Sequence, residues 1–150
     1  VTEEVTGLDL VAAQLRVASG ERLPWRQDEV VQRGAAIECR IYAEDPAKKF
    51  MPSPGRITRL VFPHGPGLRL ESGVAEGVEV SVHYDPLLAK LITRGSTREE
   101  ALSRMEAALA AVVVEGVATV IPFHRRVLRS AAFRDGRVHT QMVEQGGFDG

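Results

Sequence analysis

The stretch GAAIECRIYAEDP, from Gly34 to Pro46, constrains the fold most, because apolar residues recur at every second position. Successive side chains of a strand point to opposite faces of the sheet. One face would carry only apolar side chains, those of Ala35, Ile37, Cys39 and Ile41. The other would carry Ala36, Glu38, Arg40 and Tyr42. The pattern predicts a core-facing strand, and from spacing alone a structural pairing of Arg40 is favoured over a catalytic role.

Several further segments have strand character and are separated by turn residues. They are residues 56–62, 68–71, 78–83 and 89–95. Before them, the proline-rich residues 44–55 predict a long, stiff loop. Short strands joined by tight turns favour an antiparallel sheet.

Three helices are expected, and the second has the clearest signals. Ser96 as N-cap with Glu99 three residues later would form a capping box, and Gly116 would end that helix. Its apolar stripe consists of Leu102, Met105, Leu109 and Val112. The first helix is expected over residues 8–19 and the third over residues 122–131, with one more short structured piece in the tail. The sequence therefore predicts an α+β domain, an antiparallel sheet flanked by helices.

Size and charge exclude several classes of function. A chain of 150 residues can form one domain with a real core, and its net charge of −1 provides no field that would attract nucleic acid or an anionic membrane. No apolar stretch approaches the length of a membrane span. The single cysteine, Cys39, excludes an internal disulfide, so a reducing, cytoplasmic location is predicted.

The residues by themselves identify no catalytic site. The four histidines lack the spacing of metal ligands and are interpreted as surface or structural residues: His64, His83, His124 and His139. No phosphate-binding glycine loop or nucleophile elbow is present. Cys39 lies on the predicted apolar face, where a buried, inert thiol is expected. Asp85, before Pro86, is better explained as a cap of the following turn than as a site residue.

Five motifs, taken in order, nevertheless resemble the C-terminal part of biotin carboxylase, as found in acyl-CoA carboxylases and pyruvate carboxylase. They are VTEEVTGLDLVAAQLRVASGERLP, GAAIECRIYAEDP, FMPSPGRI, YDPLLAKLI and EGVATVIPFHRRVL. Two positions depart from the family pattern: Ala35 replaces a usual histidine, and Val120 stands where many members have asparagine. The resemblance covers the chain apart from its last few residues, and it implies the domain that completes an ATP-grasp enzyme.

The resemblance also implies roles for individual residues. In the family, ATP and bicarbonate give carboxyphosphate, and the ureido nitrogen of biotin is then carboxylated. Arg40 matches the arginine that contacts bicarbonate and the ureido oxygen, where a permanent positive charge favours developing negative charge. Glu38 and Tyr42 would orient Arg40. Tyr84 and Asp85 would help to bind the substrate, with Asp85 supporting the arginine.

Two further regions receive expectations from the same resemblance. Thr140 falls where the chain of the family returns to the adenine pocket, which makes it a candidate cofactor-binding residue. Arg69 and Glu71 correspond to a region used in subunit pairing, so a homodimer is expected. The other expected partners are a biotin carboxyl carrier domain and a carboxyltransferase subunit or domain, with no nucleic acid and no membrane.

The resemblance finally divides the chain. Residues 1–33 would end the ATP-grasp portion, residues 34–145 would form the C-terminal domain, and residues 146–150 a tail. The catalytic base, the metal-binding carboxylates and the ATP lid are expected before Val1. ATP, with Mg or Mn, would be bound mainly by that part, and the isolated chain would be inactive. A non-catalytic assembly or regulatory module of the same fold is the alternative.

Overall fold

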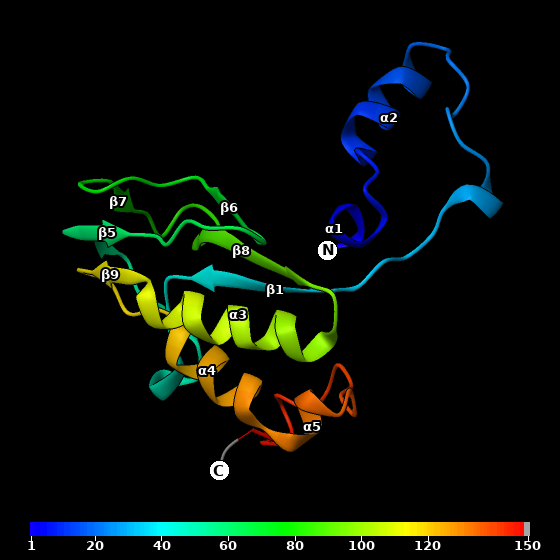
Figure 1. The fold of residues 1–150 in the computed structure, drawn as a ribbon. Helices are drawn as coiled ribbons and strands as arrows, with labels where there is room; N and C mark the ends of the chain where they lie inside the picture. The colour runs from blue at the N-terminus through cyan, green and yellow to red at the C-terminus, as the bar shows by residue number, and fades with distance from the viewer. Residues whose placement is uncertain (149–150) are drawn as a thin grey trace.

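A three-stranded antiparallel sheet forms the centre of the molecule, as the computed structural model of residues 1–148 shows (Figure 1). Its strands lie in the order β1 (Ala35–Tyr42), β8 (Leu87–Gly95) and β6 (Leu68–Ser72). The predicted alternation of β1 is confirmed, because Ile37, Cys39 and Ile41 are buried. Glu38 and Arg40 on the opposite face are exposed. The predicted strands 68–71 and 89–95 are also present.

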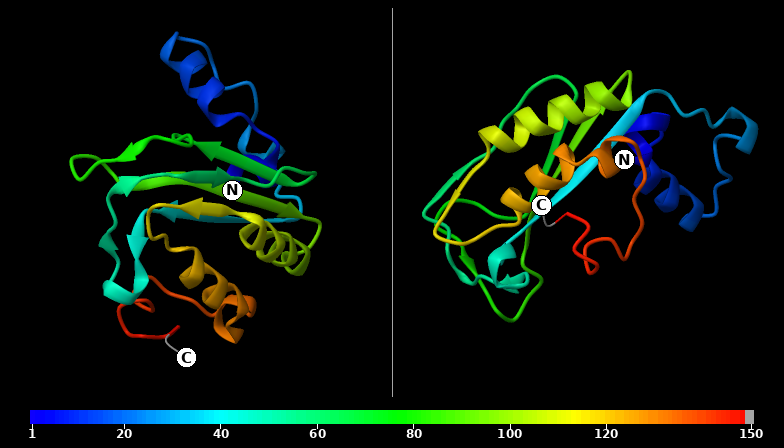
Figure 2. Two further views of the ribbon diagram at one scale, coloured as in Figure 1. Left: turned by 90° about the vertical axis from the view of Figure 1, so that its left-hand side faces the viewer. Right: turned by 90° about the horizontal axis from the view of Figure 1, so that it is seen from below.

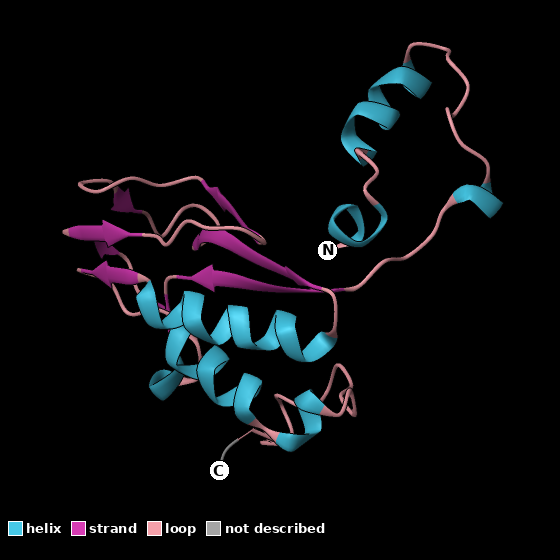
Figure 3. Cartoon of the chain, in the orientation of Figure 1, coloured by secondary structure: helices cyan, strands magenta, loops and turns pink. Residues whose placement is uncertain are grey.

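Helices cover the face of this sheet that carries Ile37, Cys39 and Ile41, so the sheet and the helices form two layers (Figure 3). Helix α3 (Arg98–Ala111) packs Leu102, Met105 and Leu109 against the buried side chains of β1 and β8. Helix α4 (Ile121–Arg129) lies beside α3 and is followed by α5 (Ala131–Arg134), as Figure 2 shows. The predicted α+β class, an antiparallel sheet flanked by helices, is confirmed.

Three two-stranded pairs extend from the central sheet. They are β2 (Glu44–Asp45) with β3 (Met51–Pro52), β4 (Gly55–Arg56) with β7 (Glu79–Val80), and β5 (Arg59–Val61) with β9 (Val113–Glu115). The region predicted as a loop, residues 44–55, therefore contains short strands and the 3-10 turn η2 (Pro46–Lys48). Of the predicted strand 78–83, only Glu79–Val80 is a strand.

The predicted strand 56–62 is divided because the chain changes its pairing partner at Ile57. The Ile57 N–H donates to the Val78 carbonyl oxygen at 2.9 Å, next to β7. The N–H of the following residue, Thr58, donates to the Glu115 carbonyl oxygen at 2.9 Å, next to β9. Ile57 itself is fully buried in the core. A partner that lies far away in sequence thus decides where one strand ends and the next begins.

Both predicted ends of helix α3 need correction. Thr97 is the N-cap, and its side chain accepts a hydrogen bond from the Glu100 N–H, so the cap lies one residue later than expected. The Glu100 side chain accepts in turn from the N–H of Ser96, the residue before the cap, at 2.7 Å. The helix ends at Ala111, before Gly116, because Val113–Glu115 pairs with β5. The β-branched residues Val113 and Val114 suit a strand once a partner is available.

In the N-terminal segment, α1 (Thr2–Thr6) contacts the sheet, whereas α2 (Leu10–Ala18) and the stretch after it project away from the sheet (Figure 1). The segment also contains the 3-10 turn η1 (Gln27–Glu29). The helix predicted over residues 8–19 is confirmed as α2, whereas α1 was not predicted. Val11 and Leu15, members of the apolar stripe that predicted α2, are 61% and 66% exposed. In this chain the stripe therefore meets solvent.

The last expected element, a short structured piece in the tail, forms neither a helix nor a strand within the described residues. Of residues 136–148, positions 140–148 form successive turns, without a helix or strand, and residues 149 and 150 lie outside the described part. Phe148 packs edge-on against Phe123 of α4, with ring centroids 6.2 Å apart. Within residues 1–148, no helix is both long and apolar enough to cross a membrane.

Candidate functional site

The outer face of the central sheet presents two rows of side chains, set by the register of the strands. One row consists of Arg40, Lys90 and Glu71. The next consists of Glu38, Ile92 and Arg69. Directly opposed side chains on one sheet face lie close enough to interact. The alternation seen in the sequence of β1 thus places Glu38 and Arg40 on a shared, charged surface.

Arg40 has its guanidinium over the ring of Tyr42, with Cζ 5.4 Å from the ring centroid. Such a contact at an exposed site contributes roughly 0.5–1 kcal/mol. Among residues 1–148, no carboxylate lies within ion-pair distance of this guanidinium, so the structural pairing with Glu38 or a neighbouring strand is not observed. A guanidinium has five N–H donors, and these donors can therefore serve an acceptor from outside the chain.

The backbone of Arg40 is held by a residue that sequence reasoning did not assign. His124 Nε2 lies 2.8 Å from the Arg40 carbonyl oxygen, across 84 residues of sequence. His124 was interpreted only as a surface or structural histidine because it lacks metal-ligand spacing. A signal in the sequence was available, because His124 is four residues from the apolar residues Val120 and Leu128 and so shares their helix face. In the structure both of these residues are buried, and this face of α4 is packed.

Asp85 lies just before β8, at the Tyr42 end of β1. Its carboxylate accepts a hydrogen bond from the Leu87 N–H at 2.8 Å, so the capping interpretation is confirmed. The next residue, Pro86, ties this turn to β1 by accepting from the Ala43 N–H at 2.8 Å. Burial raises the pKa of the Glu44 carboxyl, and the negative charge of Asp85 raises it further. Two carboxylates thus meet beside the end of the Arg40 strand.

Tyr84 and Thr140, two further predicted site residues, have exposed side chains. Tyr84 is 83% exposed, so its ring is accessible from solvent. Thr140 is exposed within the turns of the tail. Within residues 1–148, neither side chain forms a hydrogen bond with Glu38, Arg40 or Asp85. The structure therefore places Glu38 and Arg40 on one face of β1 and the Asp85 turn beyond the Tyr42 end of that strand, and it does not bring Thr140 into contact with them.

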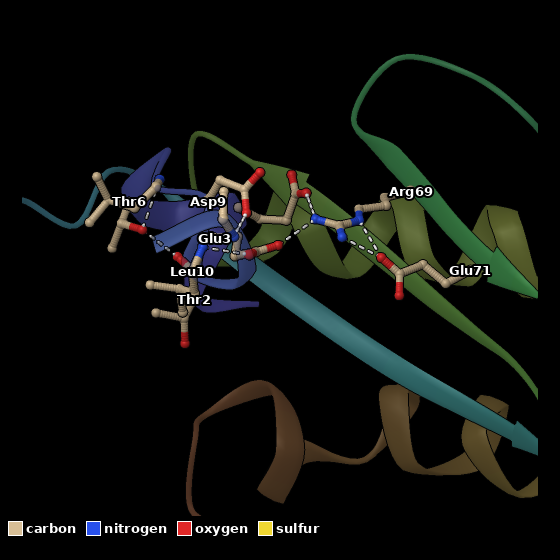
Figure 4. Close-up of polar contacts among 10 residues, drawn as sticks. Thr2, Glu3, Thr6, Asp9, Leu10, Arg69 and Glu71 are labelled. Atoms are coloured by element: carbon tan, nitrogen blue, oxygen red, sulfur yellow. Dashed lines mark hydrogen bonds and ion pairs between the residues drawn. The ribbon is translucent and has the colours of Figure 1, made fainter. Parts of the chain in front are cut away.

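Arg69 forms the centre of a separate charged cluster on β6 (Figure 4). Its Nη1 donates to Glu3 Oε2 at 2.9 Å and approaches Glu4 Oε1 at 3.4 Å, and its Nε donates to Glu71 Oε1 at 2.8 Å. The hydrogen bonds that Arg69 donates to Glu3 and Glu71 raise the pKa of Arg69. This cluster joins α1 to the outer face of the sheet. Because the pairs are exposed, each contributes little to stability.

No group of three or more histidine, cysteine, aspartate or glutamate side chains within residues 1–148 is arranged to hold a metal ion. Cys39 is buried, and desolvation raises the pKa of its thiol to about 12. The expected inert thiol on the apolar face of β1 is therefore present. The outer face of the central sheet therefore offers the positive charge of Arg40, with the carboxylates of Glu38 and Glu71 on the same face.

Most of this chain matches one known protein family. A family model described as "Biotin carboxylase C-terminal domain" matches residues 38–145. The chain belongs to the biotin carboxylase C-terminal domain family. The match includes β1 from Glu38 onward, the Asp85 turn, α3 and α4. The resemblance found in the sequence is thus confirmed.

Curated relatives and a solved structure agree with this assignment. Biotin carboxylase 1 of Bacillus subtilis is 47% identical over 144 residues, which are 96% of this chain and 32% of that protein. The biotin carboxylase of Pseudomonas aeruginosa is 48% identical over 145 residues, 97% of this chain and 32% of that protein.

One structural neighbour is the biotin carboxylase domain dimer of Hydrogenobacter thermophilus 2-oxoglutarate carboxylase, in complex with MgADP, ADP and bicarbonate. It superposes with a TM-score of 0.94 at 43% identity, over 100% of this chain and 34% of that chain. This chain therefore spans about a third of the length of these relatives.

Proposed function

We propose that this chain is the C-terminal part of a biotin carboxylase, which carboxylates carrier-bound biotin with ATP and bicarbonate. The observation that supports this most directly is the guanidinium of Arg40. It is exposed, directed by Tyr42 and without a carboxylate partner in residues 1–148, and it lies in the region that matches the family. A charge held in this way is suited to an anionic or polarised oxygen brought by another part of the enzyme.

In this proposal Arg40 binds bicarbonate and the ureido oxygen of biotin. The biotin ring supplies the ureido nitrogen that becomes carboxylated. A permanent charge fixed on a strand stabilises the negative charge that develops on the adjacent oxygen, and it needs no reorganisation during the reaction. Tyr42 and Glu38 orient the guanidinium. Tyr84 and Asp85 form the neighbouring wall of the substrate site.

The nucleotide would be held mainly outside this chain. Because residues 1–148 offer no group of metal ligands, we assign Mg or Mn to the remaining part of the enzyme. Thr140 is proposed to border the adenine pocket, for which its exposed hydroxyl is suitable. We further propose that residues 1–33 end the ATP-grasp portion, residues 34–145 form the C-terminal domain and residues 146–150 a tail.

The expected partners follow from the same reaction. They are a biotin carboxyl carrier domain, a carboxyltransferase and a second copy of the subunit, all in the cytoplasm. We propose that Arg69 and Glu71 lie at or near the subunit contact. The dimer of the Hydrogenobacter thermophilus neighbour supports pairing of the subunits.

The test is to replace Arg40 by Met in the complete enzyme subunit. Methionine keeps much of the aliphatic bulk and removes the charge. We expect the rate of biotin carboxylation to fall by a factor on the order of 10²–10³, the usual effect of losing one such electrostatic contact. The affinity for ATP should stay nearly unchanged. Asp85→Asn should reduce the rate less, because it would disturb only the support of the arginine.

Arg59→Met is the matched control, since Arg59 is an exposed strand arginine of β5 that pairs with Glu115. It should leave the rate of biotin carboxylation close to that of the unchanged enzyme. A structural role of Arg40 predicts a different result for Arg40→Met. Near-normal carboxylation by a less stable Arg40→Met enzyme would make Arg40 a structural residue and would refute its proposed role in the reaction.

A further inference from the structure

Strand β1 is at the edge of the central sheet, because it pairs with β8 on one side only. Two of its carbonyl groups, those of Arg40 and Tyr42, face the start of α4. Helix α4 binds both of them. The Val120 N–H donates to the Tyr42 oxygen at 3.2 Å, and His124 Nε2 lies 2.8 Å from the Arg40 oxygen. The start of α4 thus takes the place of a further strand at this edge.

We propose that His124 is a positioning residue for Arg40: its imidazole binds the Arg40 carbonyl and so fixes the direction of the guanidinium over Tyr42. This inference rests on the proposed function of Arg40, which it deepens. The Val120 contact uses a main-chain N–H, which a substitution other than proline does not remove. His124 is therefore the residue at which a substitution can alter the binding of β1 to α4. The bond acts on the residue itself rather than on a distant part of the sheet.

The chemistry of the ring defines the state that this role requires. A carbonyl oxygen only accepts hydrogen bonds, so Nε2 must carry the proton. Burial lowers the pKa of His124, and the bond to the Arg40 carbonyl opposes this effect more weakly. At neutral pH the ring is therefore uncharged, with its proton on Nε2 and none on Nδ1.

The surroundings of His124 keep the ring in place. The preceding residue, Phe123, is nearly buried and packs edge-on against Phe50, with ring centroids 5.0 Å apart. Val120 and Leu128, one turn before and one turn after His124, are also buried. Helix α4 cannot rotate without losing these contacts, so the position of Nε2 relative to β1 is well determined.

Two substitutions separate the donor from the shape of the ring. In glutamine the side-chain nitrogen is as many bonds from the backbone as Nε2 is in histidine, so His124→Gln can keep the bond. His124→Phe keeps a ring and loses the donor. His64→Phe, at an exposed histidine in the loop before β6, controls for the added aromatic bulk.

The first measurement uses NMR spectroscopy of the 150-residue chain and does not depend on activity. Long-range proton–nitrogen correlations should show His124 protonated on Nε2, and the Tyr42 ring should shift the Arg40 side-chain resonances upfield. We expect His124→Phe to abolish this shift and His124→Gln to retain it. A proton on Nδ1, or an unchanged Arg40 shift in a folded His124→Phe chain, would overturn the inference.

The second measurement is biotin carboxylation by the complete subunit. We expect His124→Phe to lower kcat about tenfold, the scale of losing one hydrogen bond, without changing KM for ATP. His124→Gln should restore most of the rate. Equal rates for the two variants, once normalised to the folded fraction, would contradict positioning. An unchanged subunit without any biotin carboxylation would refute the proposed function instead, and the NMR result would still decide the role of His124.

Discussion

Two leucines in two helices of this chain should respond very differently to replacement by alanine. Leu109 of α3 is 1% exposed and lies in the central core, whereas Leu15 of α2 is 66% exposed. Leu109→Ala removes buried methyl groups and leaves a cavity, so we expect a loss of about 2–5 kcal/mol in the free energy of unfolding. Leu15→Ala should change it by less than about 0.5 kcal/mol, because alanine suits a helix and little burial is lost.

Urea unfolding followed by far-UV circular dichroism measures both free energies of unfolding. The fluorescence of Trp25 adds a local probe, since Trp25 lines a cavity together with Ala12 and Ala13 of α2. Hydrogen exchange should also be faster in residues 10–18 than in residues 102–109, because only the second segment is packed in the core.

A large effect of Leu15→Ala would refute this reasoning. A loss above about 1.5 kcal/mol, well outside the range of exposed sites, would mean that the apolar stripe of α2 is covered in solution. Equal and strong protection of both segments from hydrogen exchange would lead to the same conclusion. A small effect of Leu109→Ala, in turn, would mean that α3 is not packed as described.

Two further outcomes are expected of the 150-residue chain. It should not hydrolyse ATP in response to bicarbonate, because phosphoryl transfer requires bound metal and phosphate-positioning groups, and residues 1–148 contain no group of metal ligands. Bicarbonate-dependent ADP release by the purified chain would contradict this. Cys39 should resist thiol reagents at pH 8, since burial raises its pKa to about 12. Its rapid modification in the folded chain would show that β1 opens readily.

The sequence alone determined the elements whose signals are local. The alternation over residues 35–42 predicted which face of β1 is buried, and the stripe of Leu102, Met105 and Leu109 predicted the packed face of α3. These patterns repeat every two or 3.6 residues, so they are visible without any knowledge of the fold. The family motifs, rather than the periodicity, pointed to Arg40 as a site residue.

Only the tertiary structure decided the features that depend on distant partners. The chain pairs with β7 before Ile57 and with β9 after it, so one strand ends and another begins at this residue. Helix α3 ends before Val113–Glu115 because these residues pair with β5. The contact between His124 and Arg40 joins residues 84 positions apart, and no local pattern encodes it. A hydrogen bond or a change of strand partner arises only when the folded chain brings both groups together, so the tertiary structure was needed to find the group that holds Arg40.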